Sequence, residues 1–236
     1  MSRRAIILAG GKGTRLRPYT VVLPKPLMPI GDYSILEVII RQLVFYKFTQ
    51  ITLAVNFHAD IFKAFFGNGA KWGTKIDYSL ETVPLGTMGP LGIMKNLPEN
   101  FLVMNGDVLT DINFQNIFKR HVKNRNIFTI PTHIRTQKVD YGVLELSKTG
   151  KLTGFKEKPE LKYNVSMGVY IANKSILKYI TRGKPYGFDD LVLALIKAKK
   201  YPAVIPYHGN WLDIGRPDDY MLAIDTLEKH RGRYIK

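Results

Sequence analysis

The first half of the 236-residue chain alternates short apolar, β-branched runs with segments of helical periodicity. The apolar runs predict strands at residues 5–9, 50–55, 75–80 and 101–105, and the helical spacing predicts helices at residues 34–46 and 59–66. Ser34 suits the N-cap of the first helix. Parallel neighbours need a crossover connection, usually a helix, so this rhythm favours a parallel sheet between helical layers. We therefore expect an α/β fold, a three-layer sandwich around a mixed, mostly parallel sheet.

The second half of the chain has more closely spaced apolar runs. They predict strands at residues 127–132, 141–146, 152–156 and 165–171, and helical patterns return at residues 189–199 and 217–229. No internal repeat, low-complexity tract or linker divides the sequence. We therefore expect residues 1–236 to form one domain, with the second half as an elaboration of the first.

Composition excludes several classes of protein. The chain has no cysteine, which rules out disulfides, thiolate zinc sites and a cysteine nucleophile. The N-terminal apolar run is too short for a signal peptide, and no stretch approaches the ~20 apolar residues that cross a bilayer, so we expect a cytoplasmic protein without a membrane partner. The net charge of +16 attracts polyanions. Because the basic residues are scattered and no RNA-binding aromatic motif accompanies them, we favour a local phosphate site over nucleic acid.

A glycine-rich loop follows the first predicted strand directly, with the sequence Leu-Ala-Gly-Gly-Lys-Gly-Thr-Arg-Leu-Arg-Pro at residues 8–18. Glycines there let backbone N–H groups approach phosphate oxygens without a Cβ in the way. The spacing does not fit a Walker A loop, and Leu16 occupies the place of the third glycine in a dinucleotide fingerprint. A plain tight turn is the alternative, which Arg15 and Arg17 within the loop make less favourable.

Two further segments place charged side chains at defined positions. Pro24 and Pro26 restrict the backbone on both sides of Lys25, which suits a lysine that neutralises a phosphate, although a proline-rich surface loop has the same appearance. The predicted strand at residues 101–105 runs into Gly106 and Asp107. Ligands of open α/β sheets bind at the carboxyl edge of the strands, so Asp107 is a candidate site residue.

Together these motifs resemble the sugar-1-phosphate nucleotidylyltransferases. The resemblance rests on Gly-Gly-x-Gly-Thr-Arg-Leu at residues 10–16, Pro-Lys-Pro-Leu at 24–27, Glu-Thr-Val-Pro-Leu-Gly-Thr at 81–87, Asn-Gly-Asp at 105–107, Tyr-Gly-Val at 141–143, Glu-Lys-Pro at 157–159 and Trp-Leu-Asp-Ile-Gly at 211–215. The order of the motifs is that of the family, and they span nearly the whole chain. The segment 84–91 looks most like the mannose-1-phosphate guanylyltransferase branch. The resemblance implies a Rossmann-like nucleotidyltransferase fold.

The resemblance also implies a reaction, NTP + sugar 1-phosphate → NDP-sugar + pyrophosphate, by in-line attack on the α-phosphate with Mg²⁺. It gives catalytic roles to Arg15, Lys25, Asp107 and Asp213, with the two aspartates as metal ligands. It places at the nucleotide Leu8, Gly10, Gly11, Gly13, Thr14, Arg15, Glu81 and Gly86. It places at the sugar phosphate Gly142, Glu157, Lys158 and Ser166. Mg²⁺ suits two carboxylates that share it with substrate phosphates.

The identity of the substrates depends on few residues. Guanine presents two adjacent donors that the carboxylate of Glu81 can accept together, which favours GTP, with a mannose- or heptose-type 1-phosphate as the second substrate. The same reaction with UTP, dTTP or CTP and glucose 1-phosphate is the alternative, and Ser166, where many relatives have Asn, leaves the sugar open. An inactive nucleotide-sugar-binding regulatory protein is a rival of another class, against which the complete set of charged motif residues argues. We also expect no β-helix extension. The oligomeric state, including a homo-oligomer, stays open.

Overall fold

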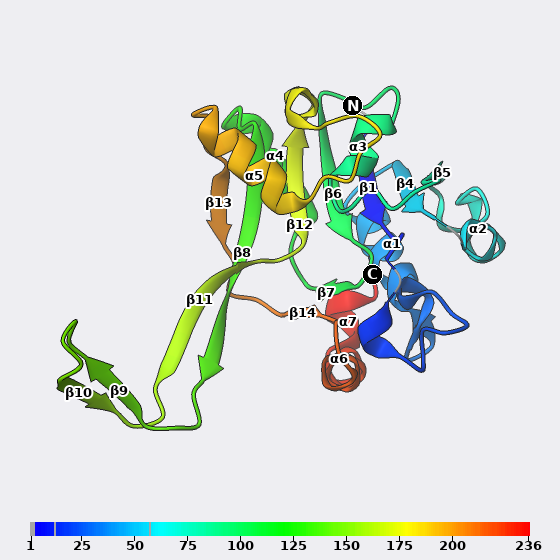
Figure 1. Ribbon diagram of the computed structural model, residues 1–236. Coiled ribbons are helices and arrows are strands. Elements are labelled where there is room, and N and C mark those ends of the chain that lie inside the picture. The colour runs from blue at the N-terminus through cyan, green and yellow to red at the C-terminus, as the bar shows by residue number, and fades with distance from the viewer. Residues whose placement is uncertain (1–2, 12, 57) are drawn as a thin grey trace.

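The computed structural model describes residues 3–11, 13–56 and 58–236. Its central sheet has the strand order β11-β8-β12-β6-β1-β4-β5, with β13 paired to β8 (Figure 1). The bounds of these strands are β1 Arg4–Leu8, β4 Gln50–Val55, β5 Lys75–Leu80, β6 Asn100–Asn105, β8 Phe128–Lys138, β11 Glu160–Ser166, β12 Val169–Asn173 and β13 Ala203–Pro206. Strands β6, β1, β4 and β5 run parallel, while β12 is antiparallel to both β6 and β8. The expected mixed sheet is confirmed.

Helices cover both faces of this sheet. They are α1 Ile35–Phe45, α2 Ala59–Phe66, α3 Gly89–Ile93, α4 Phe114–Lys123, α5 Phe188–Lys197, α6 Pro217–Lys229 and α7 Arg231–Tyr234, with 3₁₀ turns η1 Thr14–Leu16, η2 Lys25–Leu27, η3 Ala70–Trp72 and η4 Lys174–Tyr179. Successive residues of a strand point to opposite faces, so Ile7 of β1 joins the core formed with α1, α2, α4 and α6, whereas Ile6 joins the core with α3, η4 and α5. This division into two cores confirms the three-layer arrangement.

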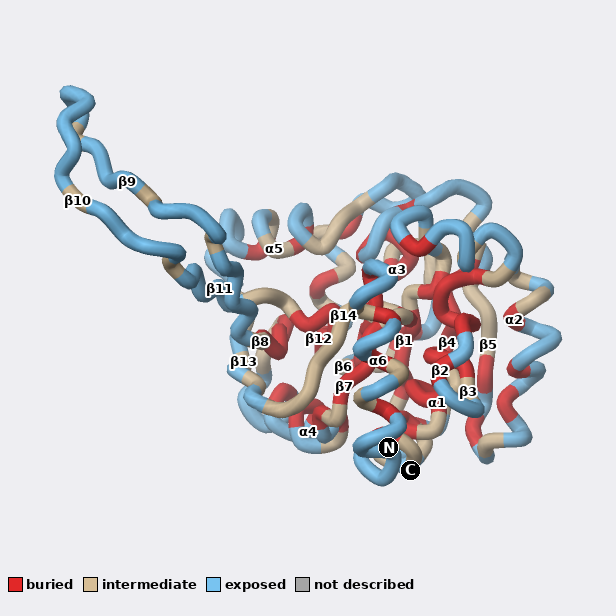
Figure 2. Tube along the Cα trace, turned by 90° about the horizontal axis from the view of Figure 1, so that it is seen from below, coloured by how far each residue is buried: buried red, intermediate tan, exposed pale blue. Residues whose placement is uncertain are grey.

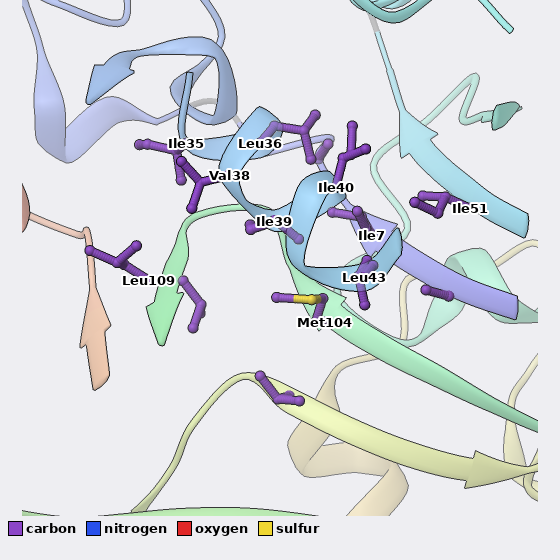
Figure 3. Packing of buried hydrophobic residues seen from close by; sticks show 14 of the residues in the cluster. Ile7, Ile35, Leu36, Val38, Ile39, Ile40, Leu43, Ile51, Met104 and Leu109 are labelled. Carbon is purple, nitrogen blue, oxygen red and sulfur yellow. The ribbon is translucent and has the colours of Figure 1, made fainter. Parts of the chain in front are cut away.

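Helix α1 shows how the sequence determines one of these layers. The hydroxyl of Ser34 accepts the backbone N–H of Glu37 at 3.2 Å and so caps the helix as expected. Its apolar face packs on Ile7 and Met104 of the sheet (Figure 3). Full burial of a large aliphatic side chain contributes about 1.5–3 kcal/mol, so this face fixes the helix against the parallel strands.

The structure corrects two parts of the secondary-structure prediction. The apolar run at residues 165–171 is not one strand: β11 ends at Ser166, Gly168 turns the chain with a φ of +68°, and β12 begins at Val169. Helix α4 was not predicted, although Asn113 caps it by accepting the N–H of Asn116 and its apolar residues recur at helical spacing.

A two-stranded arm leaves the body of the molecule. Strand β8 continues past Thr132, where its pairing with β13 ends, and from Ile134 onward it pairs with β11 alone. The strands β9 Val143–Leu146 and β10 Leu152–Lys156 form the hairpin at the tip of this arm. Both views show the arm projecting away from the sheet, and nearly all of it is exposed (Figures 1 and 2). We call residues 134–164 the arm.

Two small sheets complete the fold. Strand β7 Val108–Thr110 pairs with β14 Trp211–Asp213, and β2 Pro29–Ile30 pairs with β3 Tyr33–Ser34. The first of these pairs joins segments about a hundred residues apart at the carboxyl edge of β6. In the part of the chain that is described, we find no helix with the length and hydropathy of a membrane span.

Candidate active site

Two carboxylates meet at the carboxyl edge of the sheet. Asp107 follows β6, and the antiparallel register of β14 on β7 sets Asp213 opposite Val108, the neighbour of Asp107. The N–H of Ile214 donates to the carbonyl of Asp107 at 3.1 Å and closes this contact. The pairing of two short strands therefore brings together the two aspartates that the sequence predicted as metal ligands.

Lys25 is the counter-charge of Asp107. Its ammonium forms a short salt bridge and hydrogen bond with Oδ2 of Asp107, and the lysine side chain is only 9% exposed. Pro24 precedes the turn η2 and Pro26 lies within it, so the backbone presents the ammonium at a fixed place, as the sequence predicted. The other oxygen of Asp107, Oδ1, is buried and has no hydrogen-bond partner among the described residues.

The charges of Asp107, Lys25, Arg15 and Asp219 all influence the carboxyl group of Asp213. Burial raises the pKa of its carboxyl group, and the negative charge of Asp107 raises it further, while Lys25 and Arg15 act in the opposite direction. Arg15 also lies close to Gly215, since a Cβ on that glycine would come within 3.4 Å of the guanidinium. All four residues with predicted catalytic roles are thus gathered in one place.

This group of charges fits a divalent cation. A buried carboxylate oxygen without a partner is costly to keep unless a ligand satisfies it, and Oδ1 of Asp107 is such an atom. The described residues contain no cluster of three or more His, Asp or Glu side chains. A site with two carboxylates suits Mg²⁺, which usually takes one or two carboxylates together with substrate phosphates and waters.

The glycine loop forms a cavity of about 230 Å³ beside the two carboxylates. Its lining includes the predicted nucleotide residues Leu8, Gly11, Gly13, Thr14 and Arg15, together with Lys25 and Asp107. Gly13 has a φ of +60°, a conformation that favours glycine, and a Cβ there would lie 3.0 Å from Thr20 and 3.2 Å from Lys25. The loop therefore needs this glycine to pass close to the lysine.

A second cavity of about 400 Å³ adjoins the first and shares Leu8, Gly11 and Asp107 with it. The predicted residues Gly10, Glu81 and Gly86 line it. Oε2 of Glu81 accepts the N–H of Leu85 at 3.1 Å, which fixes the carboxylate, while Oε1 lies toward Gly10. Burial raises the pKa of Glu81, and the hydrogen bond from Leu85 partly offsets that effect. The cavity thus ends in a half-buried acceptor group.

A third cavity, of about 300 Å³, lies at the root of the arm and shares Asn105 with the second. Asp213 and Ser166 line it, so one of the four predicted sugar-phosphate residues is at the site. The hydroxyl of Ser166 donates to Tyr170 at 3.0 Å and accepts the N–H of Gly168 at 3.3 Å. Arg135 also lines this cavity, and sequence reasoning missed it because an arginine on a strand without a motif gives no signal.

The other three predicted sugar-phosphate residues lie elsewhere. Gly142, Glu157 and Lys158 are exposed on the arm, and none of them lines the three cavities. They do lie together, because a Cβ on Gly142 would come within 3.3 Å of the Glu157 carboxylate. Sequence reasoning also missed Asn56, whose amide donates to the carbonyl of Gly10 and so supports the glycine loop.

Comparison with known proteins agrees with this geometry. The sequence pattern of the nucleotidyl transferase family matches residues 4–230. The chain belongs to that family. The structure of HddC from Yersinia pseudotuberculosis complexed with GMP-PN superposes with a TM-score of 0.70 at 23% identity, covering 95% of this chain and 99% of that one. The Rossmann-like nucleotidyltransferase fold is therefore confirmed.

Nucleotidyl transferases of known activity also align with most of the sequence. The catalytic subunit beta of the mannose-1-phosphate guanylyltransferase of Drosophila pseudoobscura is 34% identical over 228 residues, which are 94% of this chain and 61% of that protein. The UTP–glucose-1-phosphate uridylyltransferase of Synechocystis is 32% identical over 241 residues, covering 94% of this chain and 62% of that protein. The chain thus spans about three fifths of the length of these relatives.

Proposed function

We propose that this chain transfers a nucleotidyl group from a nucleoside triphosphate to a sugar 1-phosphate and releases pyrophosphate. The observation that carries the proposal is a row of three adjoining cavities: Asp107 lines the first two, Asp213 lines the third, and Lys25 and Arg15 line the first. One cavity offers cations and a glycine loop for phosphates, one ends in an acceptor for a base, and one offers room for a sugar. Relatives that are guanylyl- and uridylyltransferases of sugar 1-phosphates support the same reaction.

In the proposed reaction a phosphate oxygen of the sugar 1-phosphate attacks the α-phosphorus in line, forming one P–O bond while the bond to pyrophosphate breaks. Arg15 binds the β- and γ-phosphates and stabilises the charge that grows on the leaving pyrophosphate. Lys25 holds Asp107 in place and contacts the phosphates. A Mg²⁺ ion held by Asp107 and Asp213 would neutralise phosphate charge and orient the α-phosphate. Positioning and electrostatics supply most of the acceleration in such chemistry.

For the base we propose guanine, and for the sugar a mannose- or heptose-type 1-phosphate. The backbone N–H of Leu85 occupies only one lone pair of Oε2 of Glu81, so both carboxylate oxygens can still accept donors. Guanine offers N1–H and the 2-amino group side by side, whereas uracil and thymine offer one N–H between two carbonyls. Seven relatives that are 32–34% identical to this chain are mannose-1-phosphate guanylyltransferases, which supports the same base.

The test is pyrophosphate release from a panel of GTP, UTP, dTTP, CTP and ATP with mannose, glucose and heptose 1-phosphates in Mg²⁺. We expect turnover with GTP, abolished by Asp107→Asn and retained by Asp60→Asn, whose carboxylate lies on α2 and is almost fully exposed. A tenfold preference for UTP, dTTP or CTP would overturn the guanylyl assignment and leave the reaction standing. No pyrophosphate from any pair, with the nucleotide nevertheless bound, would favour the regulatory alternative.

A further inference from the structure

The arm carries three motif residues, Gly142, Glu157 and Lys158, which line none of the three cavities of the same chain. Gly142 lies against the ring of Phe155 and the carboxylate of Glu157, where a Cβ would be 2.6 Å and 3.3 Å away. Lys158 has a φ of +42° and precedes Pro159. Such a conformation strains a non-glycine residue, and strain of this kind concentrates at functional sites. Lys47, Arg125 and Lys199 share the conformation, but they follow helix ends, where it is a common cap. Asn96 shares it as well, and asparagine adopts it more readily than lysine.

The arm keeps this group away from the cleft of its own chain. An unbroken register links β8 and β11 from Thr132 and Ser166 to Lys138 and Glu160. Six residues at about 3.3 Å each separate Ser166, at the third cavity, from Glu160 by about 20 Å. The next link is also hydrogen-bonded, since Val139 donates to the carbonyl of Pro159 at 3.1 Å. Lys158 can reach the third cavity of its own chain only if the hydrogen bonds between β8 and β11 break.

The tip of the arm has an apolar face without a cover. Register places Leu146 opposite Leu152 and Leu144 opposite Phe155, and these four residues are 58–62% exposed. An isolated two-stranded hairpin is marginally stable in water. At ~150–200 Å² for each full side chain, these four residues present on the order of 350–500 Å². An exposed apolar patch of about this size is often functional, and an exchange of two arms would bury two such patches.

The rim of the cleft offers a surface that matches the tip. Tyr19, Val21 and Val22 follow the glycine loop and are 59–81% exposed, and Tyr19 contacts α6 through the ring of Tyr220 at 6.3 Å. Helix α6 adds the exposed residues Met221 and Leu222. It is also acidic in a strongly basic chain, with Asp218, Asp225 and Glu228 against Lys229, while Asp219 already pairs with Arg135 of its own chain at 3.8 Å. The tip is basic, with lysines at positions 148, 151, 156 and 158 against two glutamates.

We propose that the arm acts in trans: the arm of one copy docks on the rim of a second copy and brings Glu157 and Lys158 to that copy's third cavity. This inference rests on the proposed function. Glu157 would supply a carboxylate that binds the sugar, and Lys158 would supply an ammonium that binds its phosphate. The third cavity of another copy, which Arg135 and Ser166 line, is the place where the proposed reaction needs them. A two-fold axis lets the two copies exchange arms, so that each site contains residues of both chains.

The first test is complementation between two defective variants. Glu157→Ala/Lys158→Ala lacks the arm group, and Asp107→Asn lacks the carboxylate of the cleft. The two chains, with different tags, are co-expressed and the mixed dimer is purified through both tags. With GTP and mannose 1-phosphate below its wild-type KM, each variant alone should retain under about 5% activity, and the mixed dimer should recover up to half of the wild-type activity. A mixed dimer no more active than its parents, beside an active wild type, overturns delivery in trans.

The second test does not depend on turnover, so it separates this inference from the proposed function. Light scattering after size exclusion should give a dimer for the wild type. Leu144→Ser/Phe155→Ser should give a folded monomer, and the control Leu193→Ser, which changes a 64% exposed leucine on α5, should remain a dimer. A monomeric wild type, or a tip variant that stays dimeric, overturns the docking of the arm. The expected masses, together with a wild type inactive on every substrate pair, would uphold the dimer and contradict the reaction.

Discussion

Replacing Lys25 with methionine should destabilise the protein by leaving Asp107 without its partner. Methionine keeps most of the volume of the lysine stem and removes the charge. Removing one partner of a buried ion pair costs about 3–5 kcal/mol, because the remaining charge is desolvated and unpaired. The Asp107 side chain is 22% exposed, so water screens part of this charge. We therefore expect a loss of about 2–3 kcal/mol in the free energy of unfolding.

The measurement is urea unfolding followed by circular dichroism in EDTA. For a chain of this size the loss corresponds to a fall of about 4–12 °C in melting temperature. Lys63→Met is the control: Lys63 and Asp60 on α2 form an exposed pair at 3.3 Å, worth well under ~1 kcal/mol. The double variant Lys25→Met/Asp107→Asn should recover at least half of the loss, because the unpaired charge is then gone.

Mg²⁺ supplies a further check on the same reasoning. A cation that binds the free carboxylates should stabilise Lys25→Met more than the wild type, where Lys25 competes for Asp107. At a concentration 100 times Kd the stabilisation reaches about 2.7 kcal/mol. Two results together would contradict a stabilising Lys25–Asp107 pair. The free energy of unfolding of Lys25→Met would lie within about 0.5 kcal/mol of the wild type, and the double variant would be less stable than Lys25→Met.

Three other variants test separate parts of the molecule. Glu81→Gln should reduce kcat/KM for GTP, with a loss of about 1–3 kcal/mol in transition-state stabilisation, and should lower the ratio of kcat/KM for GTP to that for UTP. An unchanged ratio would exclude Glu81 from base recognition. Asp213→Asn should remove most turnover without lowering the melting temperature, because burial raises the pKa of Asp213 and so already disfavours the charged carboxylate there. Near-normal turnover at limiting Mg²⁺ would contradict Asp213 as a metal ligand. Burial lowers the pKa of His121 to about 4, below the unfolded value of 6.5, so the unfolded chain binds the extra proton. Stability should therefore fall by up to about 3 kcal/mol as pH drops from 6.5 to 4, a dependence that His121→Gln should reduce.

The sequence predicted those parts of the fold that depend on local pattern. Helix α1 carries both its cap and its apolar face within twelve residues, so Ser34 and the isoleucines after it suffice. The turn at Gly168 was missed because the apolar run continues on both sides of it. Only the pairing reveals two strands, since β11 lies on one side of β8 and β12 lies on the other, between β8 and β6. Helix α4 carried the local signal, with Phe114, Ile117 and Phe118 behind the cap Asn113, and it was nevertheless overlooked.

The site divides in the same way between local and distant information. The glycine loop and Lys25 are set by neighbouring glycines and prolines, and their positions agree with the prediction. The contact between Asp107 and Asp213 depends on β7 and β14, three residues each, whose pairing no periodicity reveals; only the family resemblance predicted it. Arg135 had neither kind of signal. The roles of Gly142, Glu157 and Lys158 were predicted from motifs alone. A motif suggests the role of a residue, but it does not say in which copy of the chain that residue acts.

The charge of the site supports a role for a cation in the proposed reaction, although the chain carries a net charge of +16. Around the cleft, the charges of Arg15 and Lys25 are balanced by those of Asp107 and Asp213, and Glu81 adds another carboxylate nearby. The remaining basic residues are spread over a surface on which salt screens charges beyond about 8–10 Å. Among the described side chains of the cleft, a triphosphate therefore meets no excess of positive charge. Affinity for the nucleotide should depend on the glycine-loop N–H groups and on a divalent cation far more than on the basic surface, and raising ionic strength should weaken it only modestly.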